Sequence, residues 1–404
     1  MLFLALTLIS LWLPWPAIAS VPDRPAIAQA AIPTPTQALE RLFQAETIQS
    51  EWFAPVFLQQ VPFPQMQATL DGLTAQLGAL QGIEPLAEGY QLRFENGTLS
   101  ALIQLNDAGQ IVALLFSPLA EAVSLAEAIA AIEAFPGEAS LLVLAGDEAV
   151  AAVAAETPLA VGSAFKLAVL AALQRAIAAG TLRWDTVVPL EAAWRSLPSG
   201  LLQDWPVGSA VTLETLATLM ISVSDNTSTD ALIHVLGREA VEAVTPRNQP
   251  FLTTRDFFVL KNPENADALA AFRQGSDRDR RRLLTTLPDL PLPPASLFNG
   301  DPIALDVEWF LSARELCDLM ATVKDLPLMG VNPGVARPED WRHIAFKGGS
   351  EPGVLNLTTW LEAEDGQAYC VVATWNDPSQ ALDEMALIQT YQGLVTGLAE
   401  RSQP

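Results

Sequence analysis

Residues 163–179 constrain the fold more than any other stretch of this chain. They are mostly apolar, as in a helix that lies inside a protein core. Lys166 is the only charged residue between Glu156 and Arg175. Ser163 and Lys166 lie three residues apart, so a helix places both side chains on one face. A lysine in dry surroundings gives up its proton readily and can then accept the proton of a serine hydroxyl. The stretch therefore predicts a buried helix that begins with a candidate nucleophile and its base.

Two later segments carry polar residues in the order that such chemistry requires. Ser224-Asp225-Asn226 lies between two helical patterns, and Lys347-Gly348-Gly349 ends a predicted strand. Each segment also has a purely structural interpretation. Ser163 suits a helix N-cap, and Ser-Asp-Asn suits a turn between helices. Three segments in this order, about 60 and 120 residues apart, favour a catalytic site over three unrelated turns.

The composition excludes several classes of function. Of the 404 residues, 50% are hydrophobic and 17% charged, which is typical of a large globular protein. The formal net charge of −24 argues against a nucleic-acid-binding surface. The basic segment 278–282 is interleaved with aspartates and is interpreted as a solvated helix face. No Cys/His cluster has zinc spacing and no phosphate loop is present, so we expect no metal and no cofactor, and a small molecule as the substrate.

The N-terminus has the pattern of an export signal. Residues 2–13 are almost entirely apolar, two prolines follow, and Ala17-Ile18-Ala19 forms a small-x-small cleavage site. We therefore expect a signal peptide at 1–19, cleaved after Ala19, and a protein exported to the periplasm or beyond, with association with the cell envelope as a further expectation. The segment before the apolar run has no Lys or Arg, so an uncleaved anchor is the alternative. Residues 20–35 are rich in Ala and Pro and predict a linker.

A small α+β domain is expected at 36–119. Helical spacing covers 37–53 and 63–80, and three alternating runs follow between 90 and 116. Asn96-Gly97 and Asp107-Ala108-Gly109 separate these runs and are hairpin turn signals. Helices followed by a curved meander resemble the cone-shaped fold of the steroid-isomerase and nuclear-transport-factor group. The segment has no evident acid–base constellation, so we expect a structural or substrate-sampling role for it.

The rest of the chain predicts a connector at 120–138 and a second domain at 139–402. Two strands precede the Ser163 helix, a mostly helical region extends to residue 323, three strands follow, and a helix closes the chain. One antiparallel sheet assembled from both ends and flanked by helices makes an α/β sandwich. The predicted strands are 140–145, 149–154, 343–348, 354–361 and 369–375.

The cysteines and histidines leave alternatives open. Cys317 lies in a helical pattern and Cys370 in a predicted strand. The two could pair in an exported protein, but two buried free thiols are the preferred interpretation. His234 and His343 are the only histidines. A Ser–His–Asp triad would need one of them, yet neither has a motif context, so structural roles are expected for both.

The three ordered motifs resemble the serine β-lactamase and penicillin-binding-protein superfamily, and its class A β-lactamase branch in particular. The residues around Ser224, from Met220 to Asp230, are similar to that branch over a dozen positions. The resemblance implies an α/β sandwich of the β-lactamase/transpeptidase type. It also implies that Ser163 is the nucleophile and Lys166 its general base. Ser224 would then relay protons to the leaving group, and Lys347 would steer the substrate carboxylate.

Further roles follow from the same resemblance. Asn226 contacts the substrate amide, and Asp225 points inward to hold its loop. Gly349 permits close approach of the backbone to the ligand. The N–H groups of Ser163 and Ser350 form the oxyanion hole, which stabilises the negative charge of the tetrahedral intermediate.

The chain also departs from the class A pattern. Gly348 stands where the family has Thr or Ser, which removes a hydroxyl contact to the carboxylate. The glutamate of a Glu-x-x-Leu-Asn loop, which activates the deacylating water, is missing after Thr227. Glu351 is one candidate replacement, and a turn residue at a strand end is the alternative interpretation.

The small first domain together with these departures resembles the two-domain β-lactamase-like proteins of clavulanic acid gene clusters and exported serine hydrolases of the same layout. The likeness spans most of residues 36–400. The sequence thus predicts an acyl-serine hydrolase that acts on β-lactams, esters or amides. A D-alanyl peptidase or esterase that binds penicillin is a second hypothesis. A penicillin-binding sensor or scaffold that acylates once is a third.

Overall fold

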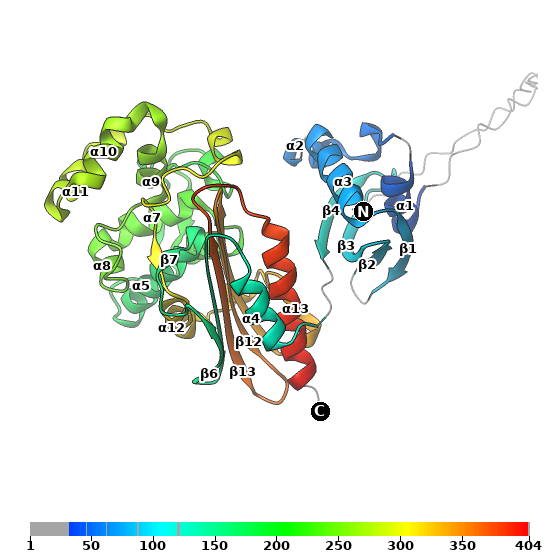
Figure 1. Cartoon of the computed structure of the whole chain (residues 1–404). Helices are drawn as coiled ribbons and strands as arrows, with labels where there is room; N and C mark the ends of the chain where they lie inside the picture. The colour runs from blue at the N-terminus through cyan, green and yellow to red at the C-terminus, as the bar shows by residue number, and fades with distance from the viewer. Residues whose placement is uncertain (1–31, 46, 62, 87–88, 119–121, 403–404) are drawn as a thin grey trace, which may run out of the picture. The chain divides into compact units, whose positions relative to one another are not determined.

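The computed structural model describes residues 32–402 apart from 46, 62, 87–88 and 119–121. The predicted signal peptide, and all but the last residues of the predicted linker, lie outside the described residues. Within the described part of the chain, none of the helices is both long and apolar enough to span a bilayer. The chain divides into two compact units, and within the described residues the first holds 32–74 and 103–114 and the second the rest. The elements up to β4 form a sheet of their own and are described first, before the elements that follow (Figure 1).

The N-terminal elements begin with helices. Thr34 starts the first helix with a capping box, because its hydroxyl accepts from the N–H of Gln37 while the Gln37 side chain accepts from the N–H of Thr34. This helix ends at Gln44, nine residues before the predicted end of the pattern at 53. The helices are α1 (Pro35–Gln44), α2 (Pro55–Gln60) and α3 (Phe63–Leu77).

Four strands then form a sheet in the order β1-β2-β3-β4. Gly97 follows the turn at Asn96, and the Asn106 carboxamide oxygen closes the next turn by accepting from the N–H groups of Ala108 and Gln110. The first strand is an addition to the three that the sequence predicts. The likeness to the steroid-isomerase group, and the domain boundaries 36–119, 120–138 and 139–402, remain predictions. The strands are β1 (Leu80–Pro85), β2 (Tyr90–Phe94), β3 (Gly97–Leu105) and β4 (Ile111–Pro118).

The larger part of the chain is built on a five-stranded antiparallel sheet in the order β11-β12-β13-β5-β6 (Figure 1). The central pairing joins β5 to β13 and therefore joins the two ends of this part of the sequence. The predicted antiparallel sheet assembled from both ends and flanked by helices is confirmed. Its strands are β5 (Glu138–Ala145), β6 (Glu148–Val153), β11 (His343–Glu351), β12 (Val354–Glu362) and β13 (Ala368–Asn376).

Both faces of this sheet are buried, which explains the unbroken apolar run in β5. Successive side chains of a strand point to opposite faces. Leu141 and Val143 pack into one core with α4 (Leu125–Glu133) and α13 (Glu384–Ser402). Leu142 lies in the other core, with the helical region. The sheet is thus the middle layer between two helical layers, as an α/β sandwich requires.

At the centre of the helical layer, α5 (Lys166–Ala178) is buried along its first eight residues. It is apolar around its whole circumference because neighbours surround it. The helices of this layer are α6 (Leu213–Ser222), α7 (Asn226–Leu236), α8 (Arg238–Glu242), α9 (Thr254–Lys261), α10 (Ala266–Gln274), α11 (Asp277–Leu284) and α12 (Ala313–Val323). The same part of the chain also contains short antiparallel strand pairs. They are β7 (Leu159–Ala160) with β10 (Phe310–Leu311), and β8 (Val187–Pro189) with β9 (Ala210–Thr212).

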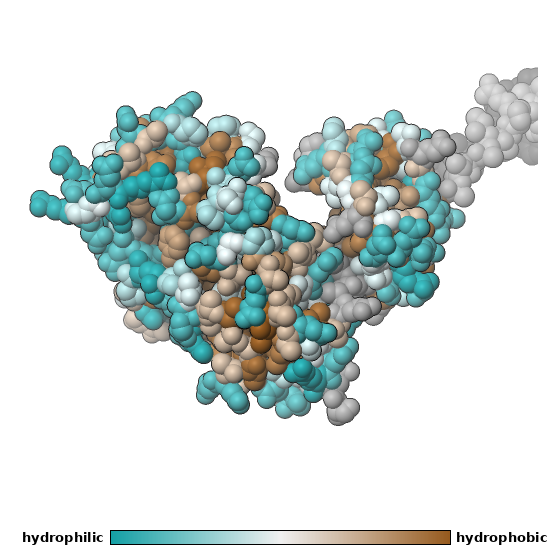
Figure 2. Space-filling view, viewed as in Figure 1, coloured by the Kyte–Doolittle hydropathy of each residue, from teal (hydrophilic) through white to brown (hydrophobic). Residues whose placement is uncertain are grey.

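The surface over α10 and α11 is hydrophilic (Figure 2). The basic segment 278–282 lies on α11, where its residues are exposed or half-buried. Asp277 and Asp279 stand in the first turn of that helix, and Arg281 pairs with Glu242. This agrees with the predicted solvated helix face.

The two cysteines form a disulfide, so the preferred interpretation of two free thiols is wrong. The sulfur atoms of Cys317 and Cys370 are 2.06 Å apart, and their Cα atoms 5.9 Å. The bond links α12 to β13. The helix packs directly on the strand and brings the two residues within disulfide reach although 53 positions separate them in sequence.

Candidate active site

A pocket of about 1020 Å³ lies where the turn before α5, the loop before α7 and strand β11 meet. All three predicted motifs contribute to its wall. The turn is η2 (Gly162–Phe165), a single 3₁₀ turn that leads directly into α5. The structure therefore brings together residues that the sequence separates by about 60 and 120 positions. The predicted site residues that line the pocket are Ser163, Ser224, Asn226, Lys347, Gly349 and Ser350.

Lys166 lies beneath this wall and is fully buried. Its ammonium nitrogen Nζ is 3.2 Å from the Ser163 Oγ and 3.0 Å from the Ser224 Oγ. It also donates to the Ser224 carbonyl oxygen at 2.6 Å and to the Asn226 Oδ1 at 2.7 Å. All four partners are uncharged oxygen atoms. The lysine is thus held in place by dipoles, and no carboxylate of the described residues contacts it to stabilise its positive charge.

These surroundings favour the neutral amine. Burial, together with the positive charge of Lys347, holds the pKa of Lys166 well below its usual range, although Asp225 and Asp230 act in the opposite sense. A neutral Lys166 has a lone pair within hydrogen-bond distance of the Ser163 hydroxyl. The pair can therefore do what a serine nucleophile and a general base do together.

Lys347 approaches the same serine from the sheet. Its Nζ donates to the Ser224 Oγ at 3.1 Å and to the Gly348 carbonyl at 2.5 Å. Burial lowers the pKa of Lys347 to about 7. The Ser224 hydroxyl thus stands between the amino groups of Lys166 and Lys347. It is placed to pass a proton from one side of the pocket to the other.

Asp225 holds Ser224 in an unusual backbone conformation. Ser224 has a φ of 56°, in the left-handed region that few non-glycine residues adopt. The Asp225 Oδ1 caps α7 through the N–H of Ser228, at 2.7 Å. Its Oδ2 accepts from the N–H groups of Leu201 and Leu202, at 2.5 and 2.9 Å. The inward-pointing, loop-holding role predicted for Asp225 is therefore confirmed.

The side chain of Asn226 is engaged within the protein at both ends. Its Oδ1 accepts from Lys166, and its Nδ2 donates to the Leu197 carbonyl at 3.0 Å. Asn226 lines the pocket, as the substrate-contact role requires. To donate to a substrate amide, however, its Nδ2 must give up or share the bond to Leu197. The contact of Asn226 with substrate remains a prediction.

Gly349 allows β11 to lie directly on the nucleophile turn. A Cβ at this position would be 2.2 Å from the Val161 carbonyl oxygen and 2.4 Å from the Ser163 nitrogen, so no side chain fits. A Cβ on Gly162 would lie 3.2 Å from the Ser350 nitrogen. The amide groups of Ser163 and Ser350 therefore belong to two backbone segments in close contact at the pocket wall. This is the arrangement that a two-amide oxyanion hole needs.

A second buried lysine lies at the same pocket and was missed by sequence reasoning. Lys261 forms ion pairs with Glu308 and Glu351, the latter at 2.7 Å between Nζ and Oε1. The side chains of Lys261 and Glu308 are fully buried, whereas that of Glu351 keeps 10% of its surface exposed and lines the pocket. The sequence by itself indicates only Glu351, as one candidate replacement for the missing loop glutamate. The three residues come from separate elements, so no local pattern could have connected them.

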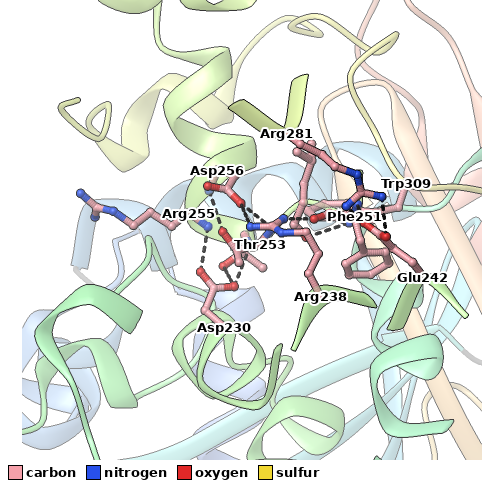
Figure 3. Close-up of polar contacts among 11 residues, drawn as sticks. Asp230, Arg238, Glu242, Phe251, Thr253, Arg255, Asp256, Arg281 and Trp309 are labelled. Carbon is pink, nitrogen blue, oxygen red and sulfur yellow. Dashed lines mark hydrogen bonds and ion pairs between the residues drawn. The ribbon is translucent and has the colours of Figure 1, made fainter. Parts of the chain in front are cut away.

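The segment between α8 and α9 lies after Thr227, in the part of the sequence where a class A β-lactamase would carry its loop glutamate. Figure 3 shows it fixed by a polar network. Arg238 contacts the Phe251 carbonyl and pairs with Asp256 at 3.0 Å. Asp230 accepts from the N–H groups of Thr254 and Arg255 at 2.7 and 2.9 Å. None of residues 243–253 lines the pocket, and Thr254, the first residue of α9, lines it without a carboxylate.

Neither histidine takes part in the site. His343 bonds through Nε2 to the Lys324 carbonyl at 2.8 Å, and His234 stacks on Trp194 with ring centroids 6.3 Å apart. Neither lines the pocket. The alternative of a Ser–His–Asp triad is therefore wrong. Across the described ranges, no group of three or more His, Cys, Asp or Glu side chains is placed to hold a metal ion.

The fold and the site together place a buried lysine against a serine at the start of a central helix, an arrangement that is suited to acyl transfer. Comparison with known families agrees. Residues 124–290 match the model of the Beta-lactamase enzyme family. This range, which holds two of the three motifs, is therefore similar to that family. The matched range covers Ser163 and Ser224 and ends before Lys347, which the structure adds to the same pocket.

The solved structures that the chain matches include two β-lactamases and a protein called PBP-A. A β-lactamase from Sphaerobacter thermophilus DSM 20745 is 23% identical, with a TM-score of 0.44, over 69% of this chain and 95% of that one. A β-lactamase from Chitinophaga pinensis DSM 2588 is 13% identical, with a TM-score of 0.46, over 69% and 98%. A protein called PBP-A is 15% identical, with a TM-score of 0.47, over 69% and 96%. No protein with a curated description matches the sequence.

Proposed function

We propose that this chain is an exported serine hydrolase that forms an acyl-enzyme at Ser163. One observation carries the proposal. The Nζ of Lys166 is buried, has no carboxylate partner, and lies 3.2 and 3.0 Å from the hydroxyls of Ser163 and Ser224. A lysine confined in this way has little structural value as a cation, because no carboxylate of the described residues contacts it. It is suited to work as a neutral base.

The acylation step follows from this placement. Lys166 accepts the Ser163 proton while the Ser163 Oγ attacks the carbonyl carbon of the substrate. The N–H groups of Ser163 and Ser350 stabilise the oxyanion that forms. As the tetrahedral intermediate collapses, Ser224 donates its proton to the leaving nitrogen or oxygen and regains one from Lys166. The products of this step are the released leaving group and an ester on Ser163, which water then hydrolyses.

The pocket supports a substrate with an apolar acyl part and an anionic group. Aromatic side chains from α9 and the segments after it form one wall, and Lys347 is the one cationic side chain among the described residues that line the pocket. Gly348 provides no hydroxyl beside Lys347. We therefore propose β-lactams, esters or related amides as substrates, with a carboxylate contact weaker than the class A pattern provides.

The missing loop glutamate supports two alternatives. A D-alanyl peptidase or esterase would turn over its own substrate and release penicillin slowly. A sensor or scaffold would acylate once and remain modified. Both share the acylation step and differ from a β-lactamase in the fate of the acyl-enzyme.

We also propose export, with cleavage after Ala19 and residence in the periplasm or outside the cell. The disulfide between Cys317 and Cys370 supports this, since such bonds persist in oxidising compartments. An association with the cell envelope would suit a cell-wall substrate. Edman sequencing of the mature protein tests the cleavage site, and a mature form that begins with Met1 contradicts it.

The activity is tested with a chromogenic cephalosporin and a p-nitrophenyl ester, followed by intact mass. Ser163→Ala is expected to abolish turnover and the mass adduct. Ser209→Ala serves as the matched control, because the Ser209 hydroxyl is exposed and bonds only to the Pro206 carbonyl. Full activity of Ser163→Ala contradicts the proposal. A stable adduct without cephalosporin turnover selects the esterase or the sensor, and multiple turnovers on the ester exclude the sensor.

A further inference from the structure

The acyl-enzyme needs a group that activates water, and the pocket offers few candidates. Among the described residues that line it, the carboxylates are Glu351 and Glu384. Glu384 is the first residue of α13 and is exposed. Glu351 ends β11, directly after Ser350, whose amide faces the nucleophile turn. The two differ in how firmly the protein holds them.

The direction of Glu351 follows from the geometry of β11. Alternate residues of a strand point to the same face, and two residues span about 7 Å. A Cβ on Gly349 would point at the Ser163 nitrogen, 2.4 Å away. Glu351 lies two positions further on and so faces the same side, toward the nucleophile turn and α9. Its side chain therefore lines the same pocket as Ser163.

The carboxylate of Glu351 is fixed by its partners. Its Oε1 accepts from the Lys261 Nζ at 2.7 Å, and Lys261 also pairs with Glu308. Lys261 is further held by the ring of Phe257, 4.1 Å from Nζ to the centroid. Glu308 is fully buried, and its Oε2 has no hydrogen-bond partner. Glu351 is thus the one member of the cluster that reaches the pocket.

The two fully buried members of the cluster have pKa values shifted in the same direction. Burial and the neighbouring Glu351 raise the pKa of Glu308 well above its usual range, although Lys261 lowers it. Burial lowers the pKa of Lys261, but Glu308 and Glu351 outweigh it, so the net shift is upward.

Resting on the function proposed above, we infer that Glu351, held by Lys261 and Glu308, is the general base that activates the water for hydrolysis of the Ser163 acyl-enzyme. The water oxygen bonds to the acyl carbonyl carbon, and its proton passes to the Glu351 carboxylate. The bond between that carbon and the Ser163 Oγ then breaks. The Ser163 Oγ takes up a proton from solvent, the carboxylic acid leaves, and Glu351 returns to solvent the proton that it took from the water. Lys261 and Glu308 are positioning residues.

The test separates acylation from deacylation in stopped-flow experiments with the p-nitrophenyl ester. Glu351→Gln is expected to keep the acylation burst within a few fold and to slow deacylation by roughly 10²–10⁴-fold. Intact mass should then show an accumulated acyl adduct. Glu384→Gln is the matched control, since it removes the other carboxylate of the pocket, and it should leave the deacylation rate unchanged. Equal loss of both rates, or an unchanged deacylation rate, in Glu351→Gln overturns the inference.

Two further measurements exclude a merely structural role. The wild-type deacylation rate should fall toward acid pH, because a protonated carboxylate cannot act as a base, and this limb should disappear in Glu351→Gln. Hydroxylamine, a strong nucleophile that needs no base, should release the acyl group from wild type and variant at similar rates. If Glu351→Gln does not fold, Glu351→Asp should give a smaller deacylation defect and keep the acid limb; wild-type deacylation in Glu351→Asp overturns the inference.

The failure of this inference differs from the failure of the proposed function. A wild-type acyl-enzyme that persists for hours overturns the role of Glu351 and leaves the acylation chemistry intact. An absent burst in wild type, or full activity of Ser163→Ala, overturns both.

Discussion

Two lysines are fully buried beside the same pocket, and they have opposite electrostatic surroundings. Lys166 contacts four uncharged oxygen atoms, while Lys261 contacts two carboxylates. The pKa of Lys166 is shifted down and that of Lys261 up. Burial acts on both in the same sense, so the neighbours decide the difference. One lysine is prepared to lose its proton, and the other is held as a permanent cation.

The largest expected effect comes from arginine at each position. Lys166→Arg should slow acylation by roughly 10²–10⁴-fold, because a guanidinium does not deprotonate and cannot act as a base. Lys261→Arg keeps the cation and should leave acylation within a few fold of wild type. Stopped-flow bursts with a p-nitrophenyl ester measure both rates. Similar losses in the two variants would show that the two lysines do not differ in the way described.

A second expected effect concerns stability. Lys261→Met leaves Glu308 and Glu351 buried without their cation and should lower the free energy of unfolding by about 3–5 kcal/mol. Lys166→Met should leave it equal or raise it. Because the folded-state pKa of Lys166 is depressed, the unfolded chain binds the proton more tightly, and wild-type stability falls as the pH drops below the unfolded pKa of about 10.4.

Urea unfolding from pH 7 to 10 measures this difference. The stability advantage of Lys166→Met over wild type should be largest at the lower pH and shrink as the pH rises. An advantage that does not change with pH would mean that the proton on Lys166 is not responsible. The m-values must agree between variants for this comparison to hold.

A third expected effect concerns the pH dependence of kcat/KM, which should differ between substrates because of Lys347. With a pKa of about 7, Lys347 is an ammonium below that pH and a neutral amine above it. The kcat/KM for a substrate with a carboxylate should fall about tenfold per pH unit above pH 7. For a neutral ester this alkaline limb should be absent. Parallel profiles for the two substrates would exclude Lys347 as the residue that binds the anion.

The smallest effect concerns Gly348, where the superfamily has Thr or Ser. A Cβ at Gly348 would lie 2.9 Å from the Phe346 Cζ, so Gly348→Thr alone should destabilise the fold by about 1–3 kcal/mol through overpacking. Phe346→Ala with Gly348→Thr makes room for the hydroxyl. The double variant should lower the KM for a carboxylate substrate by a few fold relative to Phe346→Ala. An equal KM would mean that the missing hydroxyl does not limit binding.

The sequence predicted most of the second sheet and its helices because their patterns are local. The apolar run 141–144 and the helix from Lys166 follow from periodicity alone. Strand β1 was missed, since Gly82 and Pro85 break the alternation that marks a strand. The end of the first helix was placed too late for a similar reason, because the apolar spacing continues past Gln44 where the helix does not.

The motif residues of the site were predictable, and their supports were not. Ser163, Lys166, Ser224 and Lys347 stand in recognisable patterns and meet as expected. The bond from Asn226 to the Leu197 carbonyl depends on a loop 29 residues away. The pairs of Lys261 with Glu351 and of Cys317 with Cys370 join residues 90 and 53 positions apart. Such contacts depend on tertiary packing, which a single sequence does not contain in local form.

The pairing of β5 with β13 has a consequence for the order of synthesis. Val143 of β5 is paired with Val371 of β13, so the middle of the sheet cannot form until nearly the whole chain has left the ribosome. Strand pairing between such distant segments is slow, because a long loop must be closed first. The Ser163 turn rests on β11, which is also made late. A chain released early would therefore lack the strand that forms one wall of the Ser163 pocket, and the proposed catalytic site is complete only after β11 has been made.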